Sequence, residues 1–140
     1  MDRASHGEIY FAFAVALLFA LRGGAPEALG VASYVLPLAI LTISDAAAAL
    51  VGCRFGRLRF AAGDGSKSWE GVLAFAVSAW LVSFATLTLL TDLDPAQIGA
   101  LSVALAAVGA AVEAMSTRGA DNLLLPLVLS LGLARRVALW

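Results

Sequence analysis

Long apolar runs fill most of the chain, and short polar segments separate them. The runs cover residues 9–21, 31–51, 72–90, 98–112 and 123–139. A helix needs about 20 residues to cross the hydrocarbon core of a bilayer, so the second and third runs are long enough on their own. The first and fourth runs need their flanks, residues 6–22 and 95–115. The pattern predicts about five transmembrane helices, with Asp94 and Pro95 starting the fourth.

Composition supports a membrane location. Of the 140 residues, 61% are hydrophobic and 14% are charged, whereas a soluble domain has about 25% charged residues. We therefore expect one all-α domain over residues 1–140, a polytopic integral membrane helical bundle. Strands are unexpected because the runs do not alternate and an open sheet edge cannot lie in lipid. A net charge of -1 gives no sign of a nucleic-acid partner.

The basic residues suggest an orientation, because loops rich in Lys and Arg stay in the cytoplasm. If the loop from Arg54 to Ser68 is cytoplasmic, six basic residues face inward and three face outward. The inward set is Arg3, Arg54, Arg57, Arg59, Lys67 and Arg118, and the outward set is Arg22, Arg135 and Arg136. We expect an integral membrane protein of the cytoplasmic (inner) membrane with this loop facing the cytoplasm.

Four carboxylates are predicted to converge near that same face. Asp45 lies about 10 Å below the end of its helix and Glu113 about 8 Å below the end of its own. Glu70 and Asp121 open the next helices from this side. A carboxylate inside a membrane costs about 2.5–3.5 kcal/mol, so it is usually functional. The plainer alternatives are a hydrogen bond between helices for Asp45, an ion pair with Arg118 for Glu113, and helix capping for Glu70 and Asp121.

The segment from Ser44 to Gly71, SDAAAALVGCRFGRLRFAAGDGSKSWEG, combines a buried acid with a cationic, glycine-rich loop. Glycines let backbone N–H groups approach an anion closely, so we interpret the segment as the floor of a nucleotide-phosphate site. The spacing of a Walker phosphate loop is absent. The cations could instead face anionic lipid. The small residues after Asp45 could leave room for a ligand or allow close helix packing.

The motifs SDAAAALVGCRFGR, KSWEG and GADNLLLP together resemble the phytol kinase and dolichol kinase group of polyprenol kinases, which is similar to the phosphatidate cytidylyltransferases. The resemblance implies CTP or another nucleoside triphosphate and a divalent cation. Ser44 and Asp45 match its Ser-Asp pair. The remaining matches are Gly52, Arg54, Phe55 and Gly56, then Lys67, Ser68, Glu70 and Gly71, then Glu113, Asp121 and Asn122.

Two features of the resemblance shape the expected function. The chain lacks the Lys-Asp and Pro-Gly-His-Gly-Gly elements of the cytidylyltransferases, which favours the kinases. Members usually carry further helices before this region, so a fragment, a minimal form and a bundle completed by association all stay open. We expect transfer of the γ-phosphoryl of CTP, ATP or another nucleoside triphosphate to a long-chain isoprenoid alcohol such as phytol, farnesol or a polyprenol.

The expected site follows from these matches and from the buried charges. The catalytic candidates are Asp45, Lys67 and Glu70, with Glu70 a candidate for orienting Lys67. The nucleotide-binding candidates are Ser44, Gly52, Arg54, Gly56, Arg57, Lys67, Ser68 and Asn122. Asp45, Glu113 and Asp121 are the candidates for holding Mg²⁺ or another divalent cation, which oxygen ligands suit.

The expected partners are the nucleoside triphosphate, the lipid alcohol and membrane lipids, and a homodimer is left open. Two other functions are kept. One is a phosphatidate cytidylyltransferase that makes CDP-diacylglycerol. The other is a non-enzymatic membrane subunit or ion-pathway protein that uses its buried acids as a relay.

Overall fold

The computed structural model of the chain describes residues 7–22, 27–62, 65–116 and 119–137. Arg3 and Arg118 lie outside the described residues, as do the side chains of Arg22, Arg135 and Arg136.

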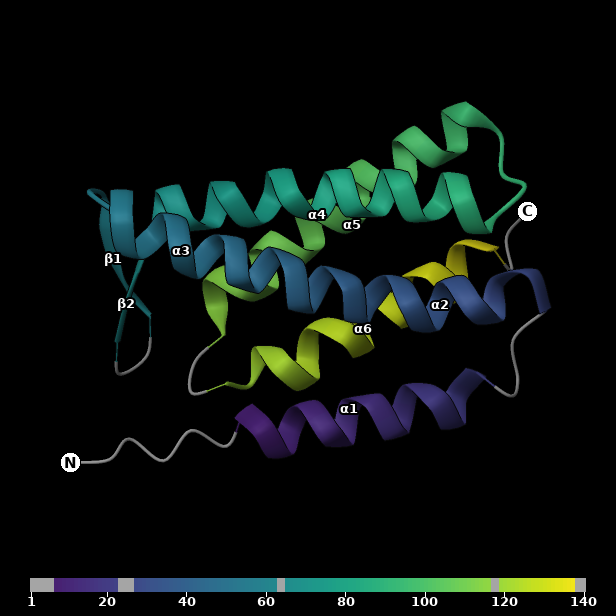
Figure 1. Ribbon diagram of the computed structural model, residues 1–140, viewed down its shortest axis with the longest axis horizontal. Helices are drawn as coiled ribbons and strands as arrows, with labels where there is room; N and C mark the ends of the chain where they lie inside the picture. Colours follow the sequence, from purple (N-terminus) through teal and green to yellow (C-terminus); the bar gives the residue numbers. More distant parts are fainter. Residues whose placement is uncertain (1–6, 23–26, 63–64, 117–118, 138–140) are drawn as a thin grey trace.

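Within the described residues the chain forms five continuous helices and one small hairpin, so the predicted all-α bundle is confirmed. The elements are α1 (Gly7–Arg22), α2 (Glu27–Ala39), the π-helical segment η1 (Ile40–Ser44), α3 (Asp45–Phe55), β1 (Arg59–Ala62), β2 (Gly65–Ser68), α4 (Trp69–Leu90), α5 (Pro95–Met115) and α6 (Asp121–Val137). The segments α2, η1 and α3 follow one another without a break and make one long helix (Figure 1).

Three helices are long and apolar enough to cross a membrane: Val31–Phe55, Trp69–Leu90 and Pro95–Met115. The bounds of α5 coincide with the flanked range that the sequence predicts. Asp94 caps α5 as expected, because its side chain accepts a hydrogen bond from the N–H of Ala96, and Gln97 completes a capping box with it. The helices α1 and α6 are apolar but shorter.

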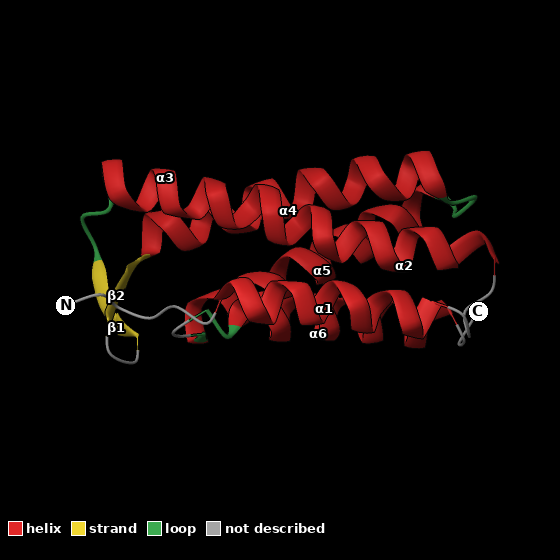
Figure 2. Cartoon of the chain, turned by 60° about the horizontal axis from the view of Figure 1, so that its bottom comes forward, coloured by secondary structure: helices red, strands yellow, loops and turns green. Residues whose placement is uncertain are grey.

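The helices lie side by side along the long axis of the molecule, and the hairpin stands at one end (Figure 1). Figure 2 shows α2, α3 and α4 on one side of the bundle, α1 and α6 on the other, and α5 between them. The buried residues of α4 recur every fourth position, at Gly71, Phe75, Ala79, Ser83 and Leu87, which puts them on one face of the helix. Phe75 packs against Gly109 of α5, where an added Cβ would lie 3.1 Å from the ring.

The same periodicity carries polar residues to the hairpin end of the bundle. The buried face of α5 runs through Ser102 and Gly109 and ends at Glu113, which is buried. Asp121 lies one turn before Leu125, the first of three core leucines of α6. Acids at these positions face inward because they continue apolar faces that the core requires.

Two local features differ from the sequence-based prediction. β1 and β2 pair as an antiparallel hairpin, with Arg59 opposite Ser68 and Phe60 opposite Lys67. The prediction that strands are absent therefore holds for the apolar runs but is wrong for the loop between them. The π-helical segment η1 was not predicted at all, and it lies directly before Asp45.

Candidate active site

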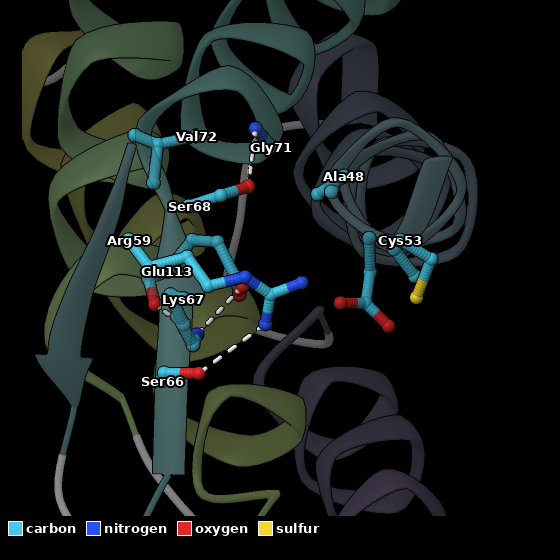
Figure 3. Close-up of a pocket in the computed structure, with 12 residues that line it drawn as sticks. Ala48, Cys53, Arg59, Ser66, Lys67, Ser68, Gly71, Val72 and Glu113 are labelled. Carbon is cyan, nitrogen blue, oxygen red and sulfur yellow. Dashed lines mark hydrogen bonds and ion pairs between the residues drawn. The ribbon is translucent and has the colours of Figure 1, made fainter. Parts of the chain in front are cut away.

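A pocket opens at the hairpin end, between α3, the hairpin and the first turn of α4, with the last turns of α5 behind it (Figure 3). Its lining residues are Asp45, Ala48, Ala49, Gly52, Cys53, Arg59, Ser66, Lys67, Ser68, Gly71, Val72 and Glu113. Small side chains of α3 form one wall. The other walls combine charged side chains from β1, β2 and α5 with small or uncharged residues of the hairpin and α4. The pocket therefore places several charged side chains next to small and apolar residues of the helices.

Three carboxylates from three helices meet beside this pocket. Asp45 of α3, Glu113 of α5 and Asp121 of α6 each place one carboxylate oxygen within 4.8 Å of the others. Glu113 and Asp121 follow Asp45 by 68 and 76 positions in the sequence. Only the packing of the bundle therefore brings the three acids together. Of the four acids predicted to converge, Glu70 is the one that does not join the cluster.

Lys67 of β2 reaches into the acidic cluster. Its Nζ lies 2.6 Å from Oε1 of Glu113 and 4.0 Å from Oδ2 of Asp121, and it also donates a hydrogen bond to the backbone carbonyl of Glu113. The Lys67 side chain is 23% exposed and that of Glu113 is 9% exposed. A close pair at this burial compensates a charge that would otherwise be costly to place among apolar helices.

The donor set fits a divalent cation. Oε2 of Glu113 is buried and has no hydrogen-bond partner among the described residues, so one strong acceptor of a clustered carboxylate is unpaired. Mg²⁺ binds oxygen at about 2.0–2.1 Å in octahedral geometry, which puts opposite ligands about 4.2 Å apart. Neighbouring octahedral ligands lie about 2.9 Å apart, so the carboxylate oxygens of Asp45, Glu113 and Asp121, which lie within 4.8 Å of one another, would draw closer together around the ion. Residues Asp45, Glu113 and Asp121 could therefore hold such an ion.

The carboxylate of Glu70 binds backbone groups outside the pocket. Its carboxylate accepts hydrogen bonds from the backbone N–H groups of Arg57, at 3.0 Å, and Leu58, at 3.1 and 3.3 Å. No contact between the Glu70 carboxylate and Lys67 is seen among the described residues, and Glu70 does not line the pocket. Its placement indicates that it fixes the chain between α3 and β1 and does not orient Lys67.

The glycines of this region serve helix packing. A Cβ added at Gly71 would lie 3.0 Å from the carbonyl oxygen of Ala48, and one at Gly56 would lie 2.8 Å from Oγ of Ser68. Ser68 is the N-cap of α4 and accepts a hydrogen bond from the N–H of Gly71. The sequence left open whether the small residues after Asp45 allow close helix packing or leave room for a ligand. Gly52 is consistent with both, because it packs closely against Ser68 and both residues line the pocket.

Five of the predicted nucleotide ligands lie off the pocket, among them Gly56, which packs against Ser68. Arg54 is exposed, with its guanidinium carbon 5.5 Å from the centre of the Phe55 ring, and Arg57 is also exposed. Asn122 donates a hydrogen bond to the backbone carbonyl of Gly7 and so joins α6 to α1. Ser44 is fully buried, and its Oγ has no partner in the described part of the chain.

Arg59 and Ser66 line the pocket, although the sequence did not select them as ligands. Both belong to the hairpin, where Arg59 donates a hydrogen bond of 3.4 Å to Oγ of Ser66. Only the pairing of β1 with β2 brings Arg59 to the site. The four-residue strands RFAA and GSKS are too short and too poor in β-branched residues to signal that pairing from sequence.

The π-helical segment η1 affects the direction of Asp45. A π turn contains one more residue per hydrogen-bonded ring than an α turn, so it changes the face on which every later residue of the helix lies. Asp45 is the first residue after η1. Such interruptions are frequent at functional sites, and this one begins at the buried Ile40 and ends directly before Asp45.

Comparison with known proteins identifies the family. Residues 2–118 match the cytidylyltransferase family. The chain belongs to that family. A curated relative, the phytol kinase of Synechocystis sp., is 32% identical over 129 residues, which cover 91% of this chain and 53% of the relative. The chain thus spans about half the length of that relative. No solved structure matches the chain.

The family match helps to sort the candidate residues. It includes Asp45, Lys67 and Glu113 but ends before Asp121 and Asn122. The site residues on α3, β2 and α5 therefore lie within the region that matches the cytidylyltransferase family, whereas Asp121 of α6 lies beyond it. Together with the spanning helices, the relationship identifies an integral membrane protein.

Proposed function

We propose that this single membrane domain carries the active site of a lipid kinase, which transfers the γ-phosphoryl group of CTP or another nucleoside triphosphate to a long-chain isoprenoid alcohol. Phytol is the first alcohol to test, because the similar protein is a phytol kinase. The observation that carries the proposal is the meeting of Asp45, Glu113, Asp121 and Lys67 at the end of apolar helices.

The reaction suits this set of groups. The bond between the γ-phosphorus and its bridging oxygen breaks, a new bond forms to the alcohol oxygen, and the hydroxyl proton is released. The products are a lipid monophosphate and a nucleoside diphosphate. Phosphoryl transfer depends mainly on positioning and on neutralising charge at the phosphate oxygens, and the site supplies charged groups from four separate elements.

Each group has a proposed role. Asp45, Glu113 and Asp121 hold a divalent cation, which would neutralise charge on the phosphate oxygens when bound. Lys67 stands next to this cluster and supplies a cation to the triphosphate. The hydroxyl of the acceptor alcohol enters beside Ala48, Ala49 and Val72, where the wall of the pocket is apolar. The hydrocarbon tail of the alcohol can then remain between the helices. With the hairpin on the cytoplasmic side, the site meets nucleotide from the cell interior.

A phosphatidate cytidylyltransferase is the second candidate, because the family is named for cytidylyl transfer and phosphatidate is the acceptor to test first. The same pocket would then bind CTP for attack at the α-phosphorus, with release of diphosphate. The identity with a phytol kinase over 91% of the chain favours the kinase.

The position of the transferred label separates these activities. Purified protein in lipid nanodiscs would be incubated with Mg²⁺ and CTP labelled at either the α- or the γ-phosphorus, with phytol, farnesol, undecaprenol, diacylglycerol or phosphatidate. ATP would be tested in parallel. The proposal expects γ-label in the lipid fraction with an isoprenoid alcohol. α-Label in the lipid with phosphatidate would instead establish the cytidylyltransferase, and no lipid label with any acceptor would overturn both.

A further inference from the structure

We propose that Arg59 of the hairpin is the arginine that binds the phosphates of the nucleotide, and that Glu70 is a positioning residue that holds Arg59 in place. The inference rests on the proposed function in that the ligand is a nucleoside triphosphate. It replaces Arg54 and Arg57, which the sequence favoured, with a residue from a strand that the sequence did not predict.

The placement of Arg59 is the first argument. Arg59 lines the pocket together with Lys67 and Glu113, and Figure 3 shows its side chain reaching from the strand into the pocket beside Lys67. Its one hydrogen bond to a described residue is the 3.4 Å contact with Ser66. A guanidinium carries five N–H donors in a planar fork that matches phosphate geometry, so most of its donors are open to a ligand.

Arg54 and Arg57 are poorly placed for the same task. Arg54 lies in the last turn of α3 and over the ring of Phe55. Arg57 lies in the exposed connection between α3 and β1. Neither residue lines the pocket. Each can face solvent or lipid headgroups, whereas Arg59 and Lys67 both line the pocket.

The charges of the pocket also require a second cation. The three clustered carboxylates and Lys67 leave two formal negative charges at the site, which would repel a triphosphate. A divalent cation alone brings that local charge only to zero. Arg59 gives the pocket a positive formal charge, and a guanidinium stays protonated at any physiological pH.

Glu70 holds the chain immediately before Arg59. Its carboxylate binds the N–H groups of Arg57 and Leu58, the two residues that precede β1. The N–H of Trp69, next to Glu70, donates to the carbonyl of Leu58 at 3.0 Å, and the rings of Trp69 and Phe60 lie 4.9 Å apart. These contacts fasten the start of β1 to the start of α4 and so determine where the Arg59 side chain begins.

The experiment measures nucleotide binding and kinetics on the full chain in nanodiscs. Equilibrium dialysis with labelled CTP or ATP and Mg²⁺ gives the affinity, and transfer assays give separate KM values for nucleotide and alcohol. Loss of a charge-assisted contact weakens binding about 10- to 100-fold. We expect that loss for Arg59→Ala with an unchanged KM for the alcohol, partial recovery in Arg59→Lys, and a smaller loss in Arg54→Ala. Arg57→Ala, which removes an exposed arginine that does not line the pocket, is the matched control.

Glu70 is tested through its coupling to Arg59. Glu70→Ala should weaken nucleotide binding, and Glu70→Gln should recover part of it because the amide oxygen still accepts an N–H. Because Glu70 acts through Arg59, the double variant Arg59→Ala/Glu70→Ala should bind nucleotide no more weakly than Arg59→Ala alone. Fully additive losses would overturn the positioning role. Circular dichroism and thermal unfolding of each variant show whether the helices remain folded.

The outcomes for the inference and for the proposed function are separate. If the wild type phosphorylates an isoprenoid alcohol while Arg59→Ala binds nucleotide as tightly as the wild type, the inference is wrong and the function stands. If the wild type binds nucleotide, Arg59→Ala loses it and no alcohol is phosphorylated, the inference stands and the kinase is wrong. If the wild type binds neither CTP nor ATP, both are wrong.

Discussion

Replacing Lys67 with methionine tests whether the acidic cluster depends on one cation. Methionine keeps most of the length and volume of the lysine stem but removes its charge. Glu113 would then be a buried carboxylate without its partner, close to Asp45 and Asp121. We expect Lys67→Met to lower stability and to abolish transfer, and we expect the added substitution Glu113→Gln to restore stability without restoring transfer.

The structure gives the size of the effect. At 2.6 Å and an effective dielectric constant of about 20, the attraction between Nζ and Oε1 is about 6 kcal/mol before desolvation is subtracted. Breaking a buried pair by removing one partner costs about 3–5 kcal/mol. Because the Lys67 side chain is 23% exposed, we expect about 3 kcal/mol, which lowers the melting temperature by roughly 10 °C for a domain of this size. The double variant should recover at least half of this loss.

The assay is thermal unfolding in one detergent, followed by intrinsic fluorescence, for the wild type, both single variants and the double variant. Transfer of γ-label to phytol is measured on the same preparations. The coupling energy follows from the four stabilities. A Lys67→Met protein as stable as the wild type, or a double variant as unstable as Lys67→Met, would refute the claim that this pair compensates buried charge.

Three further predictions concern the acids, the glycine packing and the helix cap. Asp45→Asn should lower the transfer rate at least about 100-fold while the protein still inserts and folds, as judged by membrane fractionation and circular dichroism; near wild-type activity would rule out its role. Gly71→Ala should lower the stability by about 1–3 kcal/mol, because its Cβ would press on the carbonyl of Ala48. Gly99→Ala is the control: a Cβ there meets nothing within 4 Å, so the substitution should raise the stability by up to about 1 kcal/mol. Equal melting temperatures of the two variants would contradict this packing. Asp94→Ala should cost about 1 kcal/mol through loss of the α5 cap and leave the KM for nucleotide unchanged, and a raised KM would show that the far end of the bundle affects the site.

The helices were predictable because burial in a membrane leaves a strong record in sequence. The apolar runs, Asp94 and Pro95 gave the start of α5, and the flanks gave its full length. Asp45 and Glu113 stood out because an acid in an apolar helix is expensive. The sequence predicted only that Asp45, Glu113 and Lys67 lie near the same membrane face at a similar depth. The packing of α3 on α4 and of α4 on α5 brings them together.

The local geometry of the site was not predictable. The hairpin depends on contacts between distant residues, such as Glu70 with the backbone of Arg57 and Leu58, and its strands carry little intrinsic preference for sheet. The π-helical segment before Asp45 leaves no pattern in a run of apolar residues. For these reasons the sequence selected Arg54 and Arg57 and overlooked Arg59.

The central claim is that side chains from α3, α5 and α6 share one divalent cation with a nucleotide. Mn²⁺ binding, followed by the loss of the free-ion electron paramagnetic resonance signal in the presence of CTP or ATP, tests it directly. The account predicts one tight site in the wild type, and at least tenfold weaker binding in Asp45→Asn and in Glu113→Gln alike. Wild-type affinity in both variants, with the protein folded, would contradict it.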